Sequence, residues 1–346
     1  MALEFKNYDY QRIMTFGKKV LEIPSPSGYT KNIIDYLENI CEKENYQYEK
    51  LNNGNLVITV PGKSDYTIGI SGHVDTLGAM VCAITPKGTL KFDTIGGPIL
   101  PTYDGEYCTV MTRDGKSYQG TFLCVHEAVH VHKQARTMER NKDTMHIRLD
   151  EVVHSKQDVL NLGIQNGDYV ALDPKTVITD NGFIKSRFLD DKLSVAIIFE
   201  LLKHLKEEKI ELPNTLKVII STHEEVGFGT AYIPHVDEML AVDMGCVGEH
   251  LEGSEEKVSI CAKDSGGPYN YELNTKLINL AKELKLDYAV DIFPFYSSDV
   301  SAALRAGNNI KGALIGSGVA ASHGMERTHI KGIQNTFELL KAFILK

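Results

Sequence analysis

The sequence predicts an α/β protein whose mixed, largely parallel sheet is flanked by helices, with an inserted small β-barrel or sandwich domain. Strand-like and helix-like segments alternate at both ends of the 346-residue chain, which favours a layered α/β fold with a largely parallel core. Between them, short β-rich runs are separated by Gly, Pro and Asp turns. We therefore expect a discontinuous main domain over 1–77 and 182–346 and an inserted β-rich domain over 78–181.

The individual elements follow from the spacing of apolar residues. Apolar side chains three and four residues apart predict helices, as with Ile13, Phe16 and Val20 in the first of them. The predicted helices cover residues 9–23, 30–45, 194–209, 275–285 and 330–346. Short apolar runs bounded by turn residues predict buried strands. The predicted strands cover residues 55–60, 66–76, 215–225, 238–245 and 310–318.

The composition argues against several classes of function. The formal net charge is −9 and no basic run stands out, so the sequence predicts neither nucleic-acid binding nor membrane binding. No apolar run approaches the ~20 residues of a membrane span, and the N-terminal residues lack the features of a secretory signal. The six cysteines are scattered without a C-x-x-C pair, which is typical of reduced, mostly buried thiols. We expect a cytoplasmic protein.

Residues 126–130, HEAVH, match the H-E-x-x-H pattern of zinc proteases, in which two histidines on one helical turn bind the ion. Valines and histidines alternate through and around this segment, which is the period of a strand. Residues four apart on a strand lie roughly 13 Å apart, too far for both imidazoles to bind one zinc ion at ~2 Å. We therefore expect a strand without a zinc site, and the helical zinc protease is the alternative.

A second set of acids and histidines lies where predicted strands end. Because the carboxyl ends of parallel strands meet at one edge of a sheet, open α/β proteins build their active sites from such positions. No single member is decisive, and the interpretation depends on the ordered set. The candidates are His73, Asp75, Asp190, Asp191, Glu224, Glu225, Asp243, His323 and His329.

The spacing within two pairs indicates how their members could share a task. His73 and Asp75 are two residues apart and would face the same side of a strand, where a carboxylate can orient a metal-bound imidazole. Glu224 and Glu225 would leave a buried strand in opposite directions. One could then bind metal while the other faces a bound water as general base.

The other acids need a compensating partner. Asp190 and Asp191 precede a predicted helix and would repel each other unless a cation or Lys192 compensates, although one of them could simply cap the helix. Asp243 ends an apolar run, and a lone acid there needs a helix terminus, a lysine or a metal ion.

The complete set provides two imidazoles and three carboxylates, which suits two divalent ions of the zinc, cobalt or manganese kind. One carboxylate must then bridge two ions ~3.5–4 Å apart, with a bridging water as nucleophile. The members of this set are His73, Asp190, Glu225, Asp243 and His323.

These motifs also occur in a recognisable order. The segments GHVDT, RFLDDK, THEEVGFGTA, AVDMG and SHGMER resemble, in this order, the tetrahedral (TET-type), glutamyl-aminopeptidase-like family of dinuclear metallopeptidases. The resemblance covers essentially the whole chain, since the β-rich insert between the first and second motifs also belongs to the pattern of that family. The combined order is highly specific, whereas each motif alone is not.

The resemblance implies a role for each residue at the first two motifs. His73 would bind one metal ion, and Asp75 would orient it. Asp190 would bridge the two ions, with a cis peptide bond between it and Asp191.

The resemblance also implies that residues of the later motifs complete the metal centre. Glu224 would be the general base that deprotonates the bridging water and passes the proton to the leaving amine. Glu225 and Asp243 would bind opposite metal ions, and His323 would complete the second site.

Two features of the resemblance are less direct. The segment FYSSDVSAA is similar to a small-residue segment beside the active site of the family, so we expect Ser298 and Asp299 on the substrate side. Relatives would have a glutamate four residues after the last histidine, whereas Glu326 lies three after His323. The alternative ligand is His329, which lies close to the last helix.

The sequence therefore predicts an aminopeptidase that removes N-terminal residues from peptides with two divalent ions, zinc or cobalt, in a ligand set that also accepts manganese. The resemblance implies self-association into dimers and a tetrahedral dodecamer through the inserted domain, which would also control access to the active site. Two further alternatives stay open: a dinuclear-metal deacylase or amidohydrolase acting on a non-peptide amide, and a non-catalytic assembly protein.

Overall fold

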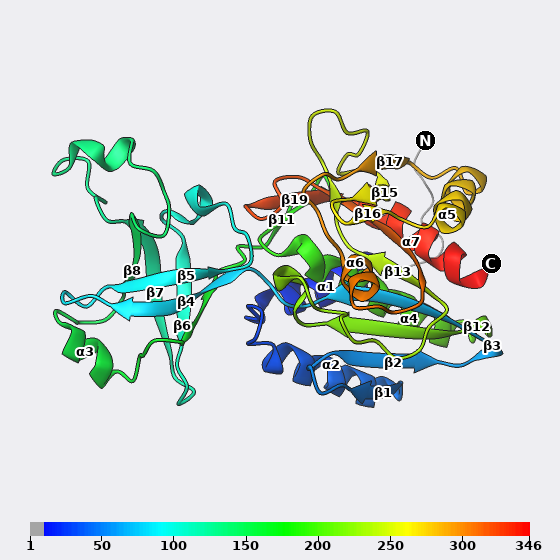
Figure 1. The fold of residues 1–346 in the computed structure, drawn as a ribbon, viewed down its shortest axis with the longest axis horizontal. Coiled ribbons are helices and arrows are strands. Elements are labelled where there is room, and N and C mark those ends of the chain that lie inside the picture. Colours follow the sequence, from blue (N-terminus) through cyan, green and yellow to red (C-terminus); the bar gives the residue numbers. More distant parts are fainter. Residues whose placement is uncertain (1–9) are drawn as a thin grey trace.

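The computed structural model describes residues 10–346 and shows two bodies side by side (Figure 1). The larger body holds a ten-stranded mixed sheet with helices packed on it, and the smaller one is a closed β-barrel. This is the predicted fold class, and the closed barrel decides between the two forms of insert that the sequence allowed. The start of the predicted first helix and the N-terminal residues expected to carry no secretory signal lie outside the described residues.

The sheet is parallel at its centre and antiparallel where β2 and β15 join it, although β17 is again parallel to β15. Its strands run in the order β1-β2-β12-β3-β13-β18-β15-β16, with β14 beside β18 and β17 beside β15. The neighbours β12, β3, β13 and β18 are parallel, whereas β2 pairs with both β1 and β12 in the antiparallel sense. The bounds are β1 (Gln47–Lys50), β2 (Leu56–Val60), β3 (Gly62–His73), β12 (Leu212–Ser221), β13 (Glu238–Val242), β14 (Gly245–Cys246), β15 (Val258–Asp264), β16 (Gly267–Pro268), β17 (Tyr288–Ile292) and β18 (Lys311–Val319).

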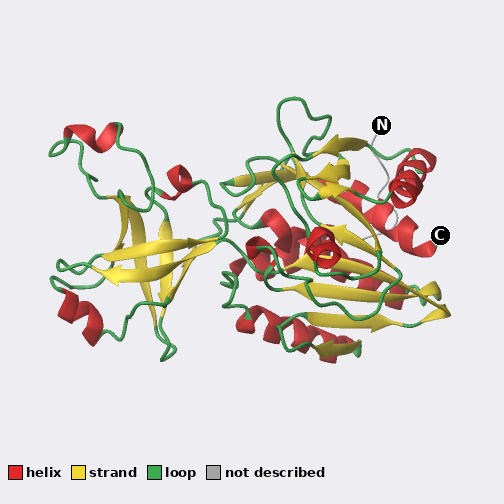
Figure 2. Cartoon of the chain, viewed as in Figure 1, coloured by secondary structure: helices red, strands yellow, loops and turns green. Residues whose placement is uncertain are grey.

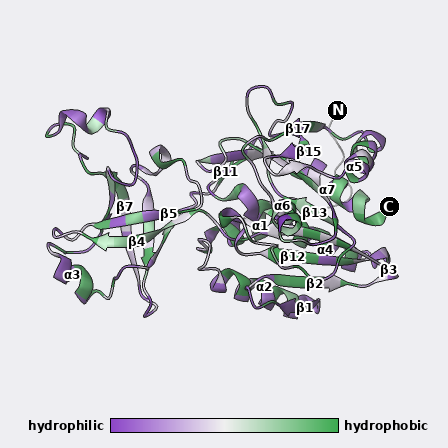
Figure 3. Cartoon of the chain, viewed as in Figure 1, coloured by the Kyte–Doolittle hydropathy of each residue, from purple (hydrophilic) through white to green (hydrophobic). Residues whose placement is uncertain are grey.

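The central strands of this sheet are buried on both faces. Successive residues of a strand point to opposite faces, so β12 sends Val218 and Ile220 into the larger hydrophobic core and Ile219 into the smaller one. Helices α1, α2, α4, α5 and α7 supply the larger core, and α6 supplies the smaller. Figure 2 shows the helices, in red, around the yellow strands of the sheet. Strands buried on both faces are apolar throughout, which is why hydrophobic colouring runs along β2 and β12 (Figure 3). The helix bounds are α1 (Tyr10–Glu22), α2 (Lys31–Glu44), α4 (Leu189–Glu207), α5 (Tyr271–Glu283), α6 (Asp299–Arg305) and α7 (Ile330–Leu345).

The sequence contains no apolar run as long as a membrane span, and the helices of the structure can be compared with this expectation. Across residues 10–346, no helix is both long and apolar enough to cross a bilayer.

The inserted segment forms a barrel with strand order β4-β5-β8-β7-β6-β9, closed by the antiparallel pairing of β4 with β9. The chain then returns to the larger body, where β10 (Val177–Ile178), β11 (Phe183–Ser186) and β19 (Glu326–His329) form a separate three-stranded sheet. The division into domains at residues 78 and 181 stays a prediction. The barrel bounds are β4 (Gly78–Ile84), β5 (Leu90–Ile95), β6 (Tyr107–Met111), β7 (Ser117–Cys124), β8 (Met145–Leu149) and β9 (Tyr169–Leu172), with the short helices η1 (Leu100–Tyr103), η2 (Lys133–Arg136) and α3 (Lys156–Asn161).

The strand predicted through the HEAVH segment is wrong beyond Cys124. β7 ends there because β8 begins at its register partner Met145, so the residues that follow have no strand to pair with. They form turns instead, and the rings of His126 and His132 stack with their centroids 4.3 Å apart. No helix forms in this segment either, and within the described chain neither His126 nor His130 belongs to a group able to hold a metal ion.

One close approach between strands fixes the position of Asp243. Gly316 of β18 lies so near β13 that a Cβ atom at this position would be 1.4 Å from the backbone oxygen of Asp243. The backbone N–H of Asp243 donates in turn to the oxygen of Ile315 at 2.9 Å. Glycine therefore allows the two strands to meet at the end where Asp243 leaves the sheet.

We expect Gly316→Ala to lower the free energy of unfolding by about 3 kcal/mol or more, because the added methyl group forces β18 away from β13. Urea unfolding followed by circular dichroism measures this effect. Gly17→Ala is the control: its Cβ would lie 3.4 Å from the Cβ of Ala196 in a helix, so a change within about 1 kcal/mol is expected. Equal stability of the two variants would contradict the close approach.

Candidate metal centre and active site

The candidate residues converge at the carboxyl end of the parallel strands. β3 ends at His73, next to Ser221 at the end of β12, and Asp243 directly follows β13. The paired acids come from the start of α4 and from the turn after β12, and His323 comes from the loop after β18. A cavity of about 770 Å³ opens over this cluster. The candidate residues that line it are Asp190, Glu224, Glu225, Asp243 and His323.

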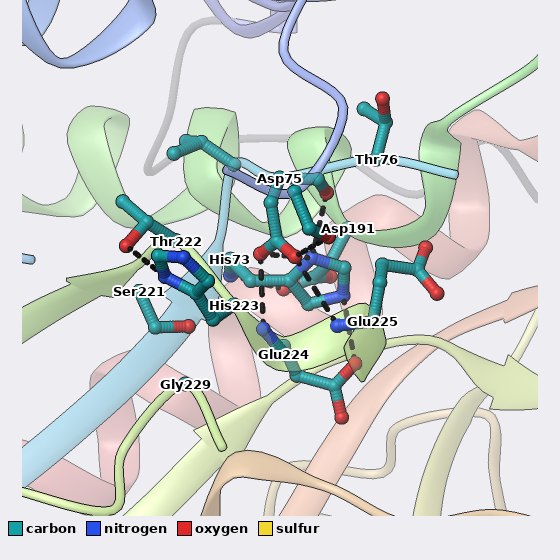
Figure 4. A network of polar contacts seen from close by, with 12 residues as sticks. His73, Asp75, Thr76, Asp191, Ser221, Thr222, His223, Glu224, Glu225 and Gly229 are labelled. Carbon is teal, nitrogen blue, oxygen red and sulfur yellow. Dashed lines mark hydrogen bonds and ion pairs between the residues drawn. The ribbon is translucent and has the colours of Figure 1, made fainter. Parts of the chain in front are cut away.

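Asp75 fixes the turn that carries the two glutamates. Its buried Oδ1 accepts a hydrogen bond from Glu224 N at 3.1 Å. Its Oδ2 accepts from Glu225 N at 3.2 Å and from Ser27 Oγ at 2.5 Å, and Figure 4 shows the two bonds to the glutamates converging on the carboxylate. The predicted contact with His73 is looser, since the ring Nδ1 lies 3.5 Å from Asp75 Oδ1 but 3.0 Å from the backbone oxygen of Asp75. Asp75 thus positions the glutamates as well as the histidine.

The carboxylate of Asp190 lies between two imidazoles. Its Oδ1 is 3.1 Å from His73 Nε2, and its Oδ2 is 3.6 Å from His323 Nε2. Burial alone would raise the pKa of Asp190, but the two histidines outweigh it and hold the pKa below its usual range. The peptide bond to Asp191 is cis, as the resemblance implies. In this arrangement, one oxygen of Asp190 could bind a cation beside His73 and the other a cation beside His323.

Asp191 lies in the same cluster, although the sequence did not predict it as a ligand. Its Oδ2 accepts a hydrogen bond from His73 N at 3.1 Å, while its buried Oδ1 has no hydrogen-bond partner in the described chain. Burial and the charge of Asp243 raise the pKa of Asp191 well above its usual value. An unpartnered buried carboxylate oxygen is costly, and a cation would relieve that cost.

Glu224 and Glu225 approach different imidazoles. They lie in η3 (Glu224–Val226), a single turn rather than the extended chain that the sequence predicted after β12. Glu224 Oε2 is nevertheless 3.7 Å from His73 Nε2, and Glu225 Oε2 is 3.5 Å from His323 Nε2. Burial is the largest reason that the pKa values of both glutamates lie well above their usual range.

Asp243 lines the cavity together with Tyr296. Asp243 Oδ1 accepts a hydrogen bond from Met244 N at 2.5 Å. Burial and the charge of Asp190 raise the pKa of Asp243 to about 7. The buried hydroxyl of Tyr296 makes no hydrogen bond of standard geometry within residues 10–346, and burial and the nearby Asp243 raise its pKa. Tyr296 lies in the segment FYSSDVSAA, in which the sequence predicts a role only for Ser298 and Asp299.

The structure separates the two candidate histidines of the last motif. The Nδ1 of His323 is 2.8 Å from the backbone oxygen of Gly97, which leaves Nε2 toward the acids. His329 instead caps α7: its Nδ1 accepts from Lys331 N at 3.2 Å, and its Nε2 is 3.0 Å from Asn181 O. Both ring nitrogens of His329 are engaged away from the cluster, so the geometry favours His323, whose role as a ligand stays a prediction.

Glu326 joins two candidate ligands through their backbones. Its Oε2 accepts from Asp190 N at 3.1 Å, and its Oε1 accepts from His323 N at 3.2 Å. Burial and the charge of Asp190 raise the pKa of Glu326 to about 8. The spacing of three residues, shorter than the resemblance implies, therefore still brings this carboxylate to both backbone groups.

Ser298 and Asp299, predicted on the substrate side, do not line the cavity. Ser298 caps α6 and lies 2.7 Å from the hydroxyl of Tyr269. Asp299 accepts from Ser221 Oγ at 2.7 Å, and Gly229 is needed beside it because a Cβ there would lie 2.6 Å from Asp299 Oδ1. These contacts support the turn that carries Glu224 and Glu225, and a direct role in substrate binding stays a prediction.

No lysine or arginine forms an ion pair with the acids of this cluster in the described part of the chain. The ammonium group of Lys192 donates to the backbone oxygen of Ile23 at 2.7 Å, and burial lowers its pKa to about 7. The ion pairs of the clustered acids are made with the two histidines. Buried carboxylates without such compensation need cations, and imidazole with carboxylate suits divalent zinc, cobalt or manganese. Two sets of ligand atoms lie within 4.8 Å of one another: His73, Asp190 and Glu225, and His73, Asp191 and Asp243.

The sequence model of the M42 glutamyl aminopeptidase family matches residues 54–339. The chain belongs to this family. The match confirms the resemblance seen in the motifs, and as an M42 peptidase the protein is a peptide hydrolase.

Individual relatives agree with the M42 assignment. The Bacillus subtilis (strain 168) protein named "Putative aminopeptidase YhfE" is 44% identical over 338 residues, which cover 96% of this chain and 97% of the relative. The Glutamyl aminopeptidase of Lactococcus lactis subsp. cremoris (strain MG1363) is 27% identical over 219 residues, 62% of this chain and 61% of the relative.

Solved structures show the same fold. The TET aminopeptidase from the marine sediment archaeon Thaumarchaeota archaeon SCGC AB-539-E09 superposes with a TM-score of 0.87 at 20% identity, over 96% of this chain and 97% of that one. The Pyrococcus horikoshii TET1 peptidase, described as assembling into a tetrahedron or a large octahedral shell, gives a TM-score of 0.83 at 21% identity, over 96% and 99% of the two chains.

We expect Glu326→Gln to weaken zinc binding about 10- to 100-fold. A glutamine provides one acceptor oxygen, so either Asp190 N or His323 N would face its amide N–H₂ group and the ligand would lose its orientation. Competition with a chromogenic chelator measures the affinity. Glu256→Gln removes a solvent-exposed partner of Lys331 and should bind zinc as the wild type does; equal affinity of the two variants would contradict the role of Glu326.

Proposed function

We propose that this M42 peptidase is a metal-dependent aminopeptidase with two divalent ions in the described cluster. The observation that supports it most is the Asp190 carboxylate between His73 and His323, with a glutamate beside each imidazole. The residues that would hold the ions are His73, Asp190, Glu225, Asp243 and His323, with Asp191 within reach of the first site. When bound, the ions would polarise the scissile carbonyl and lower the pKa of the attacking, bridging water.

Glu224 is the proton carrier in this proposal. It lines the cavity and is not needed as a ligand, so its carboxylate can take the proton of the attacking water and pass it to the leaving amine. Burial and the charges of Asp243, Asp299 and Glu225 raise its pKa well above the usual value, partly opposed by His73. A raised pKa strengthens a carboxylate as a base near neutral pH.

The surrounding residues keep the reacting groups in place. Asp75 holds the backbone of Glu224 and Glu225, and Glu326 holds that of Asp190 and His323. Such positioning matters because misplacement of a reacting group by 1 Å can cost about a hundredfold in rate.

We also infer that the chain associates with itself through the barrel. Several large apolar side chains of the barrel are exposed, among them Val131 (74%), Val152 (88%) and Tyr107 (60%), and apolar surface of this kind marks contact sites when it gathers into patches. The tetrahedron described for the Pyrococcus horikoshii relative supports self-association, for which we propose dimers and a tetrahedral dodecamer. A single-chain mass in light scattering would contradict this inference.

The state of the cysteines supports our expectation of a reducing compartment. All six are unpaired, and four of them are buried, as the sequence predicted. Reduced thiols are typical of the cytoplasm, which we propose as the location of the enzyme.

The decisive experiment compares peptides with free and with acetylated N-termini, incubated with the zinc- or cobalt-loaded protein. We expect release of one residue at a time from the free peptides and no hydrolysis of the acetylated ones, followed by mass spectrometry. Cleavage of acetylated substrates would favour the deacylase alternative, and no hydrolysis of either would favour the assembly protein.

Two variants assign the activity to this site. Glu224→Gln keeps the shape of the side chain but removes the base, so kcat should fall about 10²- to 10⁴-fold. His126→Ala alters the HEAVH segment and should leave kcat unchanged. The reverse pattern would identify the activity with the HEAVH histidines.

A further inference from the structure

The cavity has two chemically different parts. The acids and His323 form one part of the lining, and the other part consists largely of apolar side chains from four separate segments. We call this second part the apolar wall; its residues are Ile99, Val226, Cys246, Leu251, Phe293 and Phe295.

The segments of the apolar wall meet through the fold. Phe293 and Phe295 follow β17, and Leu251 lies in the loop after β14. Val226 ends the turn that carries the two glutamates. Ile99 comes from the connection between the barrel strand β5 and η1, and its backbone N–H donates to His323 O at 3.1 Å. The apolar wall therefore stands directly beside the residues that would hold the ions.

Part of the apolar wall is exposed and can be covered by an apolar group of a ligand. Phe293 is almost fully buried at 1% exposure, whereas Phe295 is fully exposed at 100% and Ile99 and Val226 are exposed at 46% and 39%. Exposed apolar surface at the mouth of a cavity gains stability when another apolar group covers it. A substrate side chain next to the scissile bond is such a group.

The apolar wall offers nothing to a charged side chain. Among the described residues that line the cavity, none is a lysine or an arginine, and the four carboxylates all lie in the acidic cluster. The side chain of an N-terminal glutamate would lose water without gaining a cation. A lysine side chain would meet carboxylates that are already required for the ions and for proton transfer.

We propose that this enzyme prefers peptides whose first residue is neutral and apolar, such as leucine, methionine or phenylalanine, over peptides that begin with an acidic residue. The proposal rests on the proposed function and differs from the glutamyl preference in the name of the family. Discrimination arises because an apolar first side chain covers the apolar wall, whereas a carboxylate must be buried there unpaired.

The test uses six peptides, X-Ala-Ala-Ala with a free N-terminus, where X is Leu, Met, Phe, Lys, Glu or Asp. With the zinc- or cobalt-loaded wild-type protein, we expect kcat/KM for the Leu, Met and Phe peptides to exceed that for the Glu and Asp peptides by about 100-fold or more. Equal or faster cleavage of the Glu or Asp peptides would overturn the proposal while leaving the aminopeptidase function intact. Fastest cleavage of the Lys peptide would overturn it as well, and no cleavage of any peptide would contradict the proposed function itself.

Two variants test the apolar wall directly. Leu251→Arg places a cation in the wall and should shift the Leu:Glu ratio of kcat/KM toward Glu by about tenfold or more. Phe295→Arg makes the same change at a fully exposed position, where folding is not at risk. Tyr271→Arg is the matched control, since this tyrosine is 84% exposed and lies at the start of α5, outside the cavity. If both wall variants keep the wild-type ratio, as the control should, the wall does not select the substrate.

Discussion

The placement of one buried carboxylate, that of Asp190, governs the rest of the site. Its two oxygens face different imidazoles, at 3.1 Å from His73 and 3.6 Å from His323. Hydrogen bonds to the backbone also hold both histidines in place. Asp191 accepts from the backbone of His73, and Glu326 accepts from the backbones of Asp190 and His323. Two further buried acids thus fix the main chain at three candidate ligand positions, so that the side chains there can face a cation.

The sheet explains how residues so distant in sequence meet. β3, β12 and β13 are parallel neighbours, so their carboxyl ends bring His73, the glutamate turn and Asp243 to one edge. The barrel contributes to the same edge, because Gly97 and Ile99 contact His323. Arg187, buried just before α4, donates to Thr102 O and to Gly324 O and so ties the barrel connection to the His323 loop. Gly97 and Ile99 of the insert therefore line the same cavity as the candidate residues.

The central strands and most of the candidate ligands could be predicted from the sequence. Strands such as β12 are buried on both faces, so their apolar runs are continuous and their polar ends stand out. The ligand candidates were found because each follows such a run. The sequence favours His323 and leaves His329 open as the alternative, since both follow β18 and the turn between them decides which ring enters the cluster. The strand predicted through HEAVH failed because strand periodicity does not reveal where the partner strand begins.

Residues that act through the backbone were harder to find. The carboxylate of Asp75 was expected to orient His73, yet its hydrogen bonds hold Glu224, Glu225 and Ser27. Ser27 lies nearly fifty residues upstream of Asp75 and carries no motif. Glu326 departs in spacing from the pattern of the resemblance, but its contact with Asp190 depends on tertiary structure. Local patterns identify candidate ligand side chains, whereas the acids that position them are set by the fold.

The most direct test of the account is the location of metal ions in crystals of the zinc-loaded protein, measured by anomalous diffraction at the zinc edge. The account predicts two peaks per chain, one near each oxygen of Asp190 and ~3.5–4 Å apart. A single peak, or a peak bound by His126 and His130, would contradict it.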